Sequence, residues 1–162
     1  MEVVHINTIG NYGSIPKLIL NIEKHANLST HFIIYGNKNS IFEASKSFKV
    51  SSLIKRYVNA MLARINDSDG FLNSGTSKKI IKYLKKIDPD IVHLHNMHGY
   101  WLNLSDLIEY LSQSKKKVVW TLHDYWLLTG RCASFSQNLC NKWKSGCGNC
   151  QFLNSYPATF RD

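Results

Sequence analysis

Residues 3–36 of the chain, VVHINTIGNYGSIPKLILNIEKHANLSTHFIIYG, decide the fold. The runs 3–9 and 31–35 are apolar and rich in β-branched or aromatic residues, as in buried strands, and a glycine follows each run. Between them, apolar residues recur at helical spacing, and Ser14 is suited to cap this helix at its N-terminus. The stretch therefore predicts a strand, a glycine turn, a helix and a second strand, which together form a βαβ unit.

The rest of the chain continues the alternation of helices and strands. Residues 54–65 predict an amphipathic helix, and a second helix around residues 80–87 places isoleucine and leucine on one face and lysines on the other. The apolar runs 91–95 and 117–122 predict two more buried strands, with a helix around residues 104–111 between them. This alternation predicts an α/β domain with a mainly parallel, Rossmann-like sheet and helices on both faces.

Length and composition bound the class of protein. With 162 residues, the chain is long enough to bury a core, and we expect residues 1–162 to form a single domain. Hydrophobic residues make up 44% and charged residues 19%, which excludes a disordered chain. No apolar run approaches the roughly 20 residues of a membrane-spanning helix, and the N-terminus does not have the pattern of a signal peptide. We therefore expect a cytoplasmic protein, in which thiols stay reduced.

The net charge of the chain is +9 at pH 7. A basic balance is typical of proteins with an anionic partner, such as nucleic acid, phospholipid head groups or a phosphorylated substrate. The alternative is a lysine-rich surface that only faces water. No arginine–aromatic interleaving and no RNA-binding signature accompany the lysines, so we expect no nucleic-acid partner.

Three strand ends carry polar groups, and in open α/β sheets ligands bind beyond the carboxyl ends of the strands. The first is the turn GNYGS, where Gly13 and Ser14 precede a helix and can present backbone N–H groups to a phosphate or another anion. The alternative is a plain tight turn, because the segment lacks the G-x-G-x-x-G fingerprint of dinucleotide-binding proteins.

The second strand end, HLHNMHGY, carries three histidines. His93 and His95 share one face of the predicted strand, and His98 lies in the loop beyond it. We interpret His93 as a packed core residue and take His95, Asn96 and His98 as candidate contacts to a substrate. A metal triad is the alternative, but no nearby carboxylate completes a usual catalytic set.

The third strand end carries His123 and Asp124, which emerge at the same edge of the predicted sheet. Histidine titrates near neutral pH and can act as a base or as a hydrogen-bond donor. We therefore take His123 as the candidate catalytic residue and Asp124 as a candidate substrate contact. The alternative is a structural pair that only orients the next loop.

All four cysteines lie in the loop of residues 130–151, at Cys132, Cys140, Cys147 and Cys150. The last two have the C-x2-C spacing of a zinc knuckle, and four thiolates leave no open position on a tetrahedral ion. We therefore predict a structural zinc ion that clips an irregular loop. Disulfides and free packed thiols are alternatives; a redox pair is disfavoured because CGNC does not open a helix after a strand.

Three segments resemble the N-terminal half of family 4 glycosyltransferases: VVHINTIGNYGS, DPDIVHLHNMHGYWLN and VVWTLHDYWLLTGRCASF. The resemblance is closest to enzymes of bacterial exopolysaccharide, colanic-acid and O-antigen assembly. NDSDGFLNSGTSKK resembles the loop before the second helix of that group, so the resemblance covers nearly the whole chain. It implies a GT-B fold, in which two Rossmann-like domains face a cleft, and a retaining transfer from a nucleotide-sugar without a catalytic metal ion.

The resemblance also implies roles for individual residues. The turn at Gly13 and Ser14 would lie near the donor phosphates and the acceptor, and His123 would contact the transferred sugar. This turn reads GSIPK where the family usually has GSTGR, which is a departure from its pattern. The residues that the resemblance places beside the acceptor are Asp67, Asp69, His95, Asn96 and His98.

We therefore expect the acceptor-binding domain of a hexosyltransferase-type enzyme of cell-surface polysaccharide or lipopolysaccharide biosynthesis. Its acceptor would be a glycan or a polyprenyl-linked sugar, and its basic surface would touch anionic membrane at the inner face of the plasma membrane. The donor-binding domain is expected outside residues 1–162, in cis or in trans, and the chain alone is expected to be inactive. Two alternatives remain: a non-enzymatic truncated or split-gene module that binds a glycan or a partner chain, and a zinc-stabilised nucleic-acid binder. Sparse arginine and the ordered βαβ pattern argue against the second.

Overall fold

The structure is a computed structural model, and it describes residues 1–162 except 27, 35–40, 43–45, 51 and 135–139. Its strands are β1 (Glu2–Asn7), β2 (Ser29–Ile34), β3 (Ser47–Lys49), β4 (Ile91–Leu94) and β5 (Lys117–Trp120). Its helices are α1 (Ser14–Ala26), α2 (Leu53–Asn66), α3 (Ser74–Ile87), α4 (Leu104–Gln113), α5 (Trp126–Thr129) and the short 3-10 helix η3 (Lys142–Lys144). Helices and strands alternate along most of the chain, as the sequence predicts.

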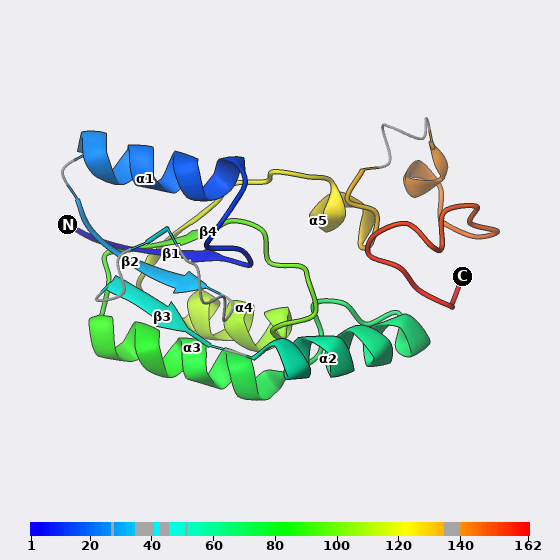
Figure 1. The fold of residues 1–162 in the computed structure, drawn as a ribbon, viewed down its shortest axis with the longest axis horizontal. Coiled ribbons are helices and arrows are strands. Elements are labelled where there is room, and N and C mark those ends of the chain that lie inside the picture. The colour runs from blue at the N-terminus through cyan, green and yellow to red at the C-terminus, as the bar shows by residue number, and fades with distance from the viewer. Residues whose placement is uncertain (27, 35–40, 43–45, 51, 135–139) are drawn as a thin grey trace.

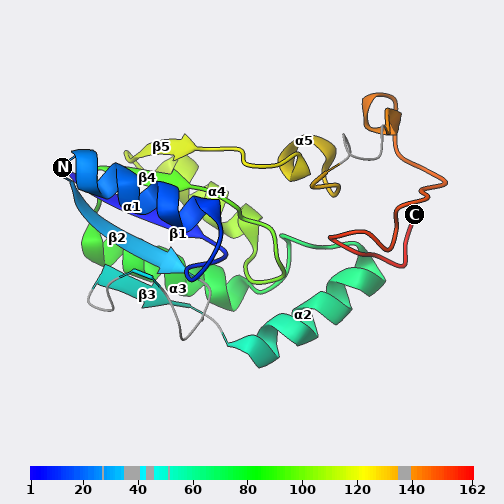
Figure 2. The ribbon, with the colours of Figure 1, turned by 45° about the horizontal axis from the view of Figure 1, so that its top comes forward.

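The five strands form one parallel sheet in the order β3-β2-β1-β4-β5. The prediction of an α/β, Rossmann-like sheet is thereby confirmed. The strands point the same way, so their carboxyl ends share one edge of the sheet (Figure 2). The β1–α1, β4–α4 and β5–α5 loops therefore meet at this edge.

The sequence does not predict β3, because residues 37–50 are polar and weakly patterned. This strand has three residues and pairs with β2 at the margin of the sheet. Phe48 stacks on Tyr83 of α3, with ring centroids 4.3 Å apart. Among the described residues, packing of Phe48 against the core and pairing with β2 hold β3, and neither leaves a repeating pattern in the sequence.

Helices cover both faces of the sheet, with α1 on one face and α3 and α4 on the other (Figure 1). The alternation of side chains along β1 decides what each face receives. Val4 and Ile6 enter the main core together with apolar residues of α3 and α4. His5 lies on the opposite face beside Phe32, which packs against Ile19 of α1. The face under α1 is therefore the one that carries histidine.

Helix α2 forms where it is predicted, but its apolar face is exposed instead of packed on the core. Asn59 and Ala63 face the protein: Asn59 Nδ2 donates to the Tyr100 carbonyl oxygen at 2.9 Å, and Ala63 is 2% exposed. An amphipathic pattern commonly marks a helix whose apolar face packs on the core, but the apolar face of α2 is exposed. The outward-facing residues, called here the α2 stripe, are Ile54, Tyr57, Val58, Met61, Leu62 and Ile65.

Beyond α5 the chain has little regular structure. In the described part of residues 130–162, η3 is the one helix or strand. The last residues return to α2 (Figure 1), where Thr159 Oγ1 and the Phe160 N–H donate to the Arg64 carbonyl oxygen at 3.1 and 2.8 Å. None of the helices in the described ranges has the length and hydropathy needed to span a bilayer.

Candidate functional site

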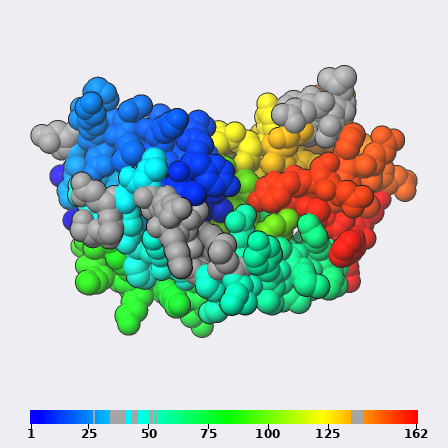
Figure 3. All heavy atoms as spheres, in the orientation of Figure 1, coloured from blue at the N-terminus to red at the C-terminus, as the bar shows by residue number. Residues whose placement is uncertain are grey.

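A pocket of about 330 Å³ lies at the carboxyl-end edge of the sheet. In Figure 3 the β1–α1 loop (blue), α2 (teal) and the C-terminal segment (orange to red) come together on this part of the surface. The pocket brings together four predicted substrate-binding residues, Gly13, Ser14, Asn96 and His98. The polar and charged lining residues are Asn7, Thr8, Tyr12, Ser14, Arg56, Asn96, His98 and Tyr156.

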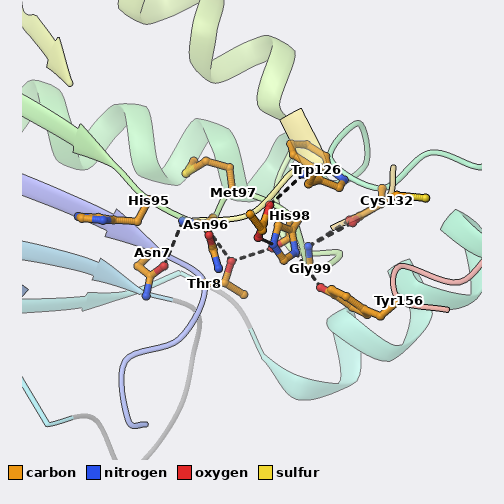
Figure 4. Close-up of polar contacts among 12 residues, drawn as sticks. Asn7, Thr8, His95, Asn96, Met97, His98, Gly99, Trp126, Cys132 and Tyr156 are labelled. Carbon is orange, nitrogen blue, oxygen red and sulfur yellow. Dashed lines mark hydrogen bonds and ion pairs between the residues drawn. The ribbon is translucent and has the colours of Figure 1, made fainter. Parts of the chain in front are cut away.

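Asn7 and Thr8 tie the β1–α1 loop to the β4–α4 loop (Figure 4). The Thr8 hydroxyl lies 2.6 Å from the Asn96 carbonyl oxygen and 2.7 Å from that of His98, so these two oxygens share its single O–H donor. Asn7 Oδ1 accepts the N–H of Asn96 at 3.3 Å, and Asn7 Nδ2 donates to the Ile9 carbonyl oxygen at 2.7 Å. Sequence reasoning missed both side chains; their signal is the polar pair NT inside the apolar run VVHINTI.

His98 forms one wall of the pocket and is 8% exposed. Its Nε2 lies 2.7 Å from Asp124 Oδ2, and its Nδ1 lies 2.9 Å from the Tyr156 hydroxyl (Figure 4). Burial raises the pKa of Asp124, but hydrogen bonds from His98 and from the Trp126 N–H outweigh burial, so the pKa is lowered. Asp124 is therefore ionised at neutral pH and holds His98 in place. The two predicted substrate contacts are thus partners of each other.

Asp69 and Asp67 lie in different surroundings. The Asp69 carboxylate accepts the N–H of Tyr100 at 2.8 Å and that of Gly99 at 3.2 Å. Burial raises the pKa of Asp69 although these hydrogen bonds act to lower it. Asp67 is exposed and ends α2 in a left-handed conformation, with φ of 52°. Asp69 therefore stabilises the loop that follows His98 through these hydrogen bonds. A contact of Asp67 or Asp69 with a substrate stays a prediction.

Three histidines from neighbouring strands form a hydrogen-bonded chain on the α1 face of the sheet. His5 Nδ1 lies 3.1 Å from His95 Nε2, and His95 Nδ1 lies 3.0 Å from His123 Nε2. His5 and His95 are each 1% exposed, whereas His123 is exposed at the ligand edge. Burial, with smaller effects from neighbouring histidines, lowers the pKa of His95 to about 2 and that of His5 to about 4. Both rings are therefore neutral at pH 7.

The position of His95 bears on its predicted role. Both of its ring nitrogens are engaged by other histidines, so it reaches the exposed edge of the sheet only through His123, which does not line the pocket. Direct contact of His95 with a substrate stays a prediction. His5 was missed by sequence reasoning, although a histidine inside the buried strand VVHINTI was a signal.

Two groups of residues have side chains that metals favour. In the part of the chain that the structure describes, His5, His93 and His95 are the group whose potential ligand atoms all lie within 4.8 Å of one another. His93 Nε2 also lies 2.8 Å from Thr121 Oγ1. His93 is half-buried, so it is less buried than the packed core residue that the sequence predicts.

The four cysteines are free thiols, and no three of them meet the same distance among the described residues. Burial raises the pKa of Cys132, and the thiols of Cys150, Cys147 and Cys140 are close enough to raise it further, while Arg131 lowers it. Soft thiols grouped in this way suit a zinc ion. The zinc site stays a prediction.

The fold and the site define an α/β, Rossmann-like domain with a pocket at the carboxyl ends of its strands. No family model matches the sequence. The chain is 31% identical, over 97% of its length, to an Escherichia coli (strain K12) protein described as "Putative colanic acid biosynthesis glycosyl transferase WcaC". It covers 41% of that relative and so spans about two fifths of the relative's length. A solved mutant creatininase matches 75% of this chain and 51% of its own, at 15% identity and a TM-score of 0.33, which is too weak to bear on fold or function.

Proposed function

We propose that the chain is the acceptor-side domain of a glycosyltransferase that acts in cell-surface polysaccharide biosynthesis. The similarity to the colanic acid protein supports this class, because it extends over 97% of the chain. The proposal includes family 4 membership, a GT-B architecture and retaining transfer of a hexose from a nucleotide-sugar. These finer points rest on the resemblance of the motifs described above.

The observation that carries the proposal is the chemistry of the pocket. Sugar hydroxyls both donate and accept hydrogen bonds, and Tyr12, Ser14 and Asn96 offer neutral groups that do the same. Gly13 immediately precedes α1, whose first N–H groups favour an anion, and Arg56 adds positive charge to the lining. A sugar linked through phosphate to a polyprenyl chain combines both kinds of partner. His123 lies at the same sheet edge, where we place the transferred sugar.

Transfer also requires a site for the nucleotide-sugar. We place this site on a donor-binding domain, in cis or in trans, because the chain spans only 41% of the relative that it resembles. On this proposal, residues 1–162 bind acceptor without turning it over. No catalytic metal ion and no nucleic acid belong to the proposed reaction.

Binding of an acceptor to the isolated chain tests the proposal. The ¹⁵N-labelled chain is titrated with a short-chain prenyl diphosphate-linked hexose, and we expect saturable shifts in the amide signals of Gly13, Ser14 and Asn96. Asn96→Ala should weaken binding about tenfold, since loss of one side-chain hydrogen bond costs roughly 0.5–1.5 kcal/mol and leaves polar groups unpaired. Glu109→Ala, on the exposed surface of α4, is the matched control. Shifts confined to residues of α3 and α4, or no saturable shifts, would contradict the proposal.

The proposal also places an anionic membrane surface against α2. The α2 stripe is a continuous apolar face on one side of a helix, with Ile54 77% and Met61 67% exposed. Helical geometry puts Lys55 two turns from Leu62 at one edge of the stripe and Arg64 two turns from Tyr57 at the other. An apolar stripe between basic edges is typical of helices that lie in the interface of anionic bilayers. A polyprenyl-linked acceptor would be held in the same surface.

A further inference from the structure

The chain of His5, His95 and His123 crosses the sheet from its buried centre to the ligand edge. His5 lies in β1, His95 directly follows β4, and His123 follows β5, so three adjacent strands each contribute one ring. The two nitrogen–nitrogen distances, 3.1 and 3.0 Å, are those of hydrogen bonds. Figure 4 shows His95 pointing back along the sheet, away from the pocket that Asn96 and His98 line.

The rings meet end to end and not face to face. For His5 and His95 the ring centroids are 5.4 Å apart, and for His95 and His123 they are 5.3 Å apart. Each centroid distance exceeds the matching nitrogen distance only by the radii of the two rings, so the bonded nitrogens lie almost on the line between the centroids. The interplanar angles are 23° and 22°. Each N–H···N bond therefore runs nearly in the planes of both rings, which is the direction of the nitrogen lone pairs.

The same geometry disfavours a metal ion among His5, His93 and His95. The rings of His93 and His95 lie with centroids only 4.1 Å apart and planes 33° apart, so they present their faces to each other. A metal ligand must point its in-plane lone pair at the ion, and facing rings do not converge in this way. His95 has both of its nitrogens in the histidine chain already. The cluster is therefore a hydrogen-bonded system.

The direction of the hydrogen bonds follows from the buried end. A neutral imidazole has one N–H and one lone pair, so the three rings donate either all outward or all inward. His5 Nε2 is buried without a partner among the described residues. Inward donation would place an N–H at this position. Buried N–H groups without an acceptor are rare, because leaving a donor unpaired costs more free energy than leaving an acceptor lone pair unpaired. Outward donation leaves only a lone pair there.

We propose that His5 and His95 are positioning residues that hold His123 as a neutral Nδ1–H donor toward an oxygen atom of the ligand. In the outward arrangement His123 Nε2 accepts from His95, so the proton of His123 sits on Nδ1, at the exposed end of the chain. His123 then serves as a hydrogen-bond donor and not as a base. A sugar hydroxyl or a phosphate oxygen can accept this bond. The nature of that ligand rests on the proposed function, but the tautomer does not.

The tautomer can be read directly by NMR. In long-range ¹H–¹⁵N spectra of the histidine-labelled chain at pH 7, we expect the protonated type of nitrogen at His123 Nδ1 and the unprotonated type at Nε2. The opposite assignment would overturn the proposal. So would stoichiometric perturbation of the rings of His5, His93 and His95 by added Zn²⁺, which would make that group a metal site. No ligand is required, so failure of acceptor binding in the titration above would contradict the proposed function and leave this inference standing.

Variants separate positioning from a merely structural role. His5→Phe removes the first donor and should leave His123 with the averaged nitrogen shifts of two exchanging tautomers. His5→Asn returns an amide N–H near the position of Nδ1 and should restore the single Nδ1–H form. His25→Phe, on the exposed surface of α1, is the control that should change nothing. An unchanged His123 tautomer in His5→Phe and in His95→Phe would overturn the proposal; if His95→Phe does not fold, the two His5 variants suffice.

Discussion

The histidines of this protein have different properties because they differ in burial and in partners. His98 is held between Asp124 and Tyr156, whereas His95 is held between two other neutral rings. In the first arrangement the imidazole is hydrogen-bonded to an ionised carboxylate. In the second it is hydrogen-bonded only to uncharged rings. Identical side chains thus serve as a pocket wall and as part of a buried chain.

The buried chain makes stability depend on pH. We expect the free energy of unfolding to decrease as the pH is lowered from 7 to 5. His5 and His95 have folded pKa values of about 4 and about 2, below their ordinary value of 6.5, so the unfolded chain binds more protons in this range. Their contribution is complete above pH 6.5 and is lost as the pH falls toward the folded values. Each ring should account for about 2 kcal/mol of the decrease by pH 5.

Urea unfolding followed by circular dichroism at several pH values measures this dependence. The informative quantity is the slope against pH, because a variant can be less stable at every pH. His95→Phe should flatten the slope, and His25→Phe should leave it unchanged because His25 is exposed. Equal slopes in the two variants would show that the buried rings do not cause the effect.

Some site residues follow from the sequence and others do not. Polar residues directly after apolar runs placed Asn96, His98 and His123 at one sheet edge, because strand ends of a parallel sheet coincide. His5 and Thr8 were missed because their partners lie 90 positions away in the chain. Sequence spacing carries no signal for contacts at such separation.

Helix α2 illustrates the same limit for an element. The apolar period predicts that a helix forms and which residues share a face, but it does not say what covers that face. Here two small or amide side chains, Ala63 and Asn59, fit against the protein, and the α2 stripe is left outside. The period therefore identifies the helix and its apolar face, but not the direction in which this face points.

The exposed α2 stripe predicts binding to lipid. We expect the chain to co-sediment with phosphatidylglycerol vesicles, and Met61→Glu to weaken this binding at least tenfold. The change puts a charge in the middle of the stripe, where apolar area and attraction to anionic head groups act together. Ile108→Glu, at a partly exposed apolar position on α4, is the matched control and should bind as the parent does.

The basic residues at the edges of the α2 stripe provide a second test of lipid binding. Binding should decrease with added salt, because exposed charges are screened over roughly 10 Å at 0.1 M ionic strength. Equal binding by Met61→Glu and the parent, or binding to zwitterionic vesicles alone, would count against docking through α2. In the first case another surface, or a further part of the protein seated on α2, would have to be considered.

Over the whole molecule, the apolar cores and the cysteine loop are separate. The core clusters of the described residues contain nothing beyond Trp126. The described residues of 130–162 are therefore held by polar contacts, by the ring contacts of Tyr156 with His98 and Tyr100, and by any metal that they bind. This separation explains the unequal success of sequence analysis. Repeating apolar patterns predicted the parallel sheet and its helices, whereas the segment after α5 has no such pattern and only its irregularity could be predicted.

The predicted zinc ion should therefore stabilise one part of the molecule. We expect about one zinc ion per chain by elemental analysis, because four thiolates complete a tetrahedral site. Chelation should speed amide hydrogen exchange in the described residues between 140 and 155 and leave β1 and β4 protected. Cys147→Ser should lose the metal, and Ser145→Ala should keep it. A metal-free chain whose four thiols all react freely in the folded state would exclude the zinc clip.

The contact of the C-terminal segment with α2 affects the order in which the sheet and the pocket form during synthesis. Tyr156 and His98 are 58 positions apart, and Thr159 and Arg64 are 95 positions apart. During synthesis all five strands leave the ribosome before Tyr156 does, and closure of long loops is slow compared with local pairing. The newborn chain can thus complete its sheet while one wall of its pocket is still being translated. Completion of the pocket therefore comes after formation of the sheet and depends on the segment that carries Tyr156.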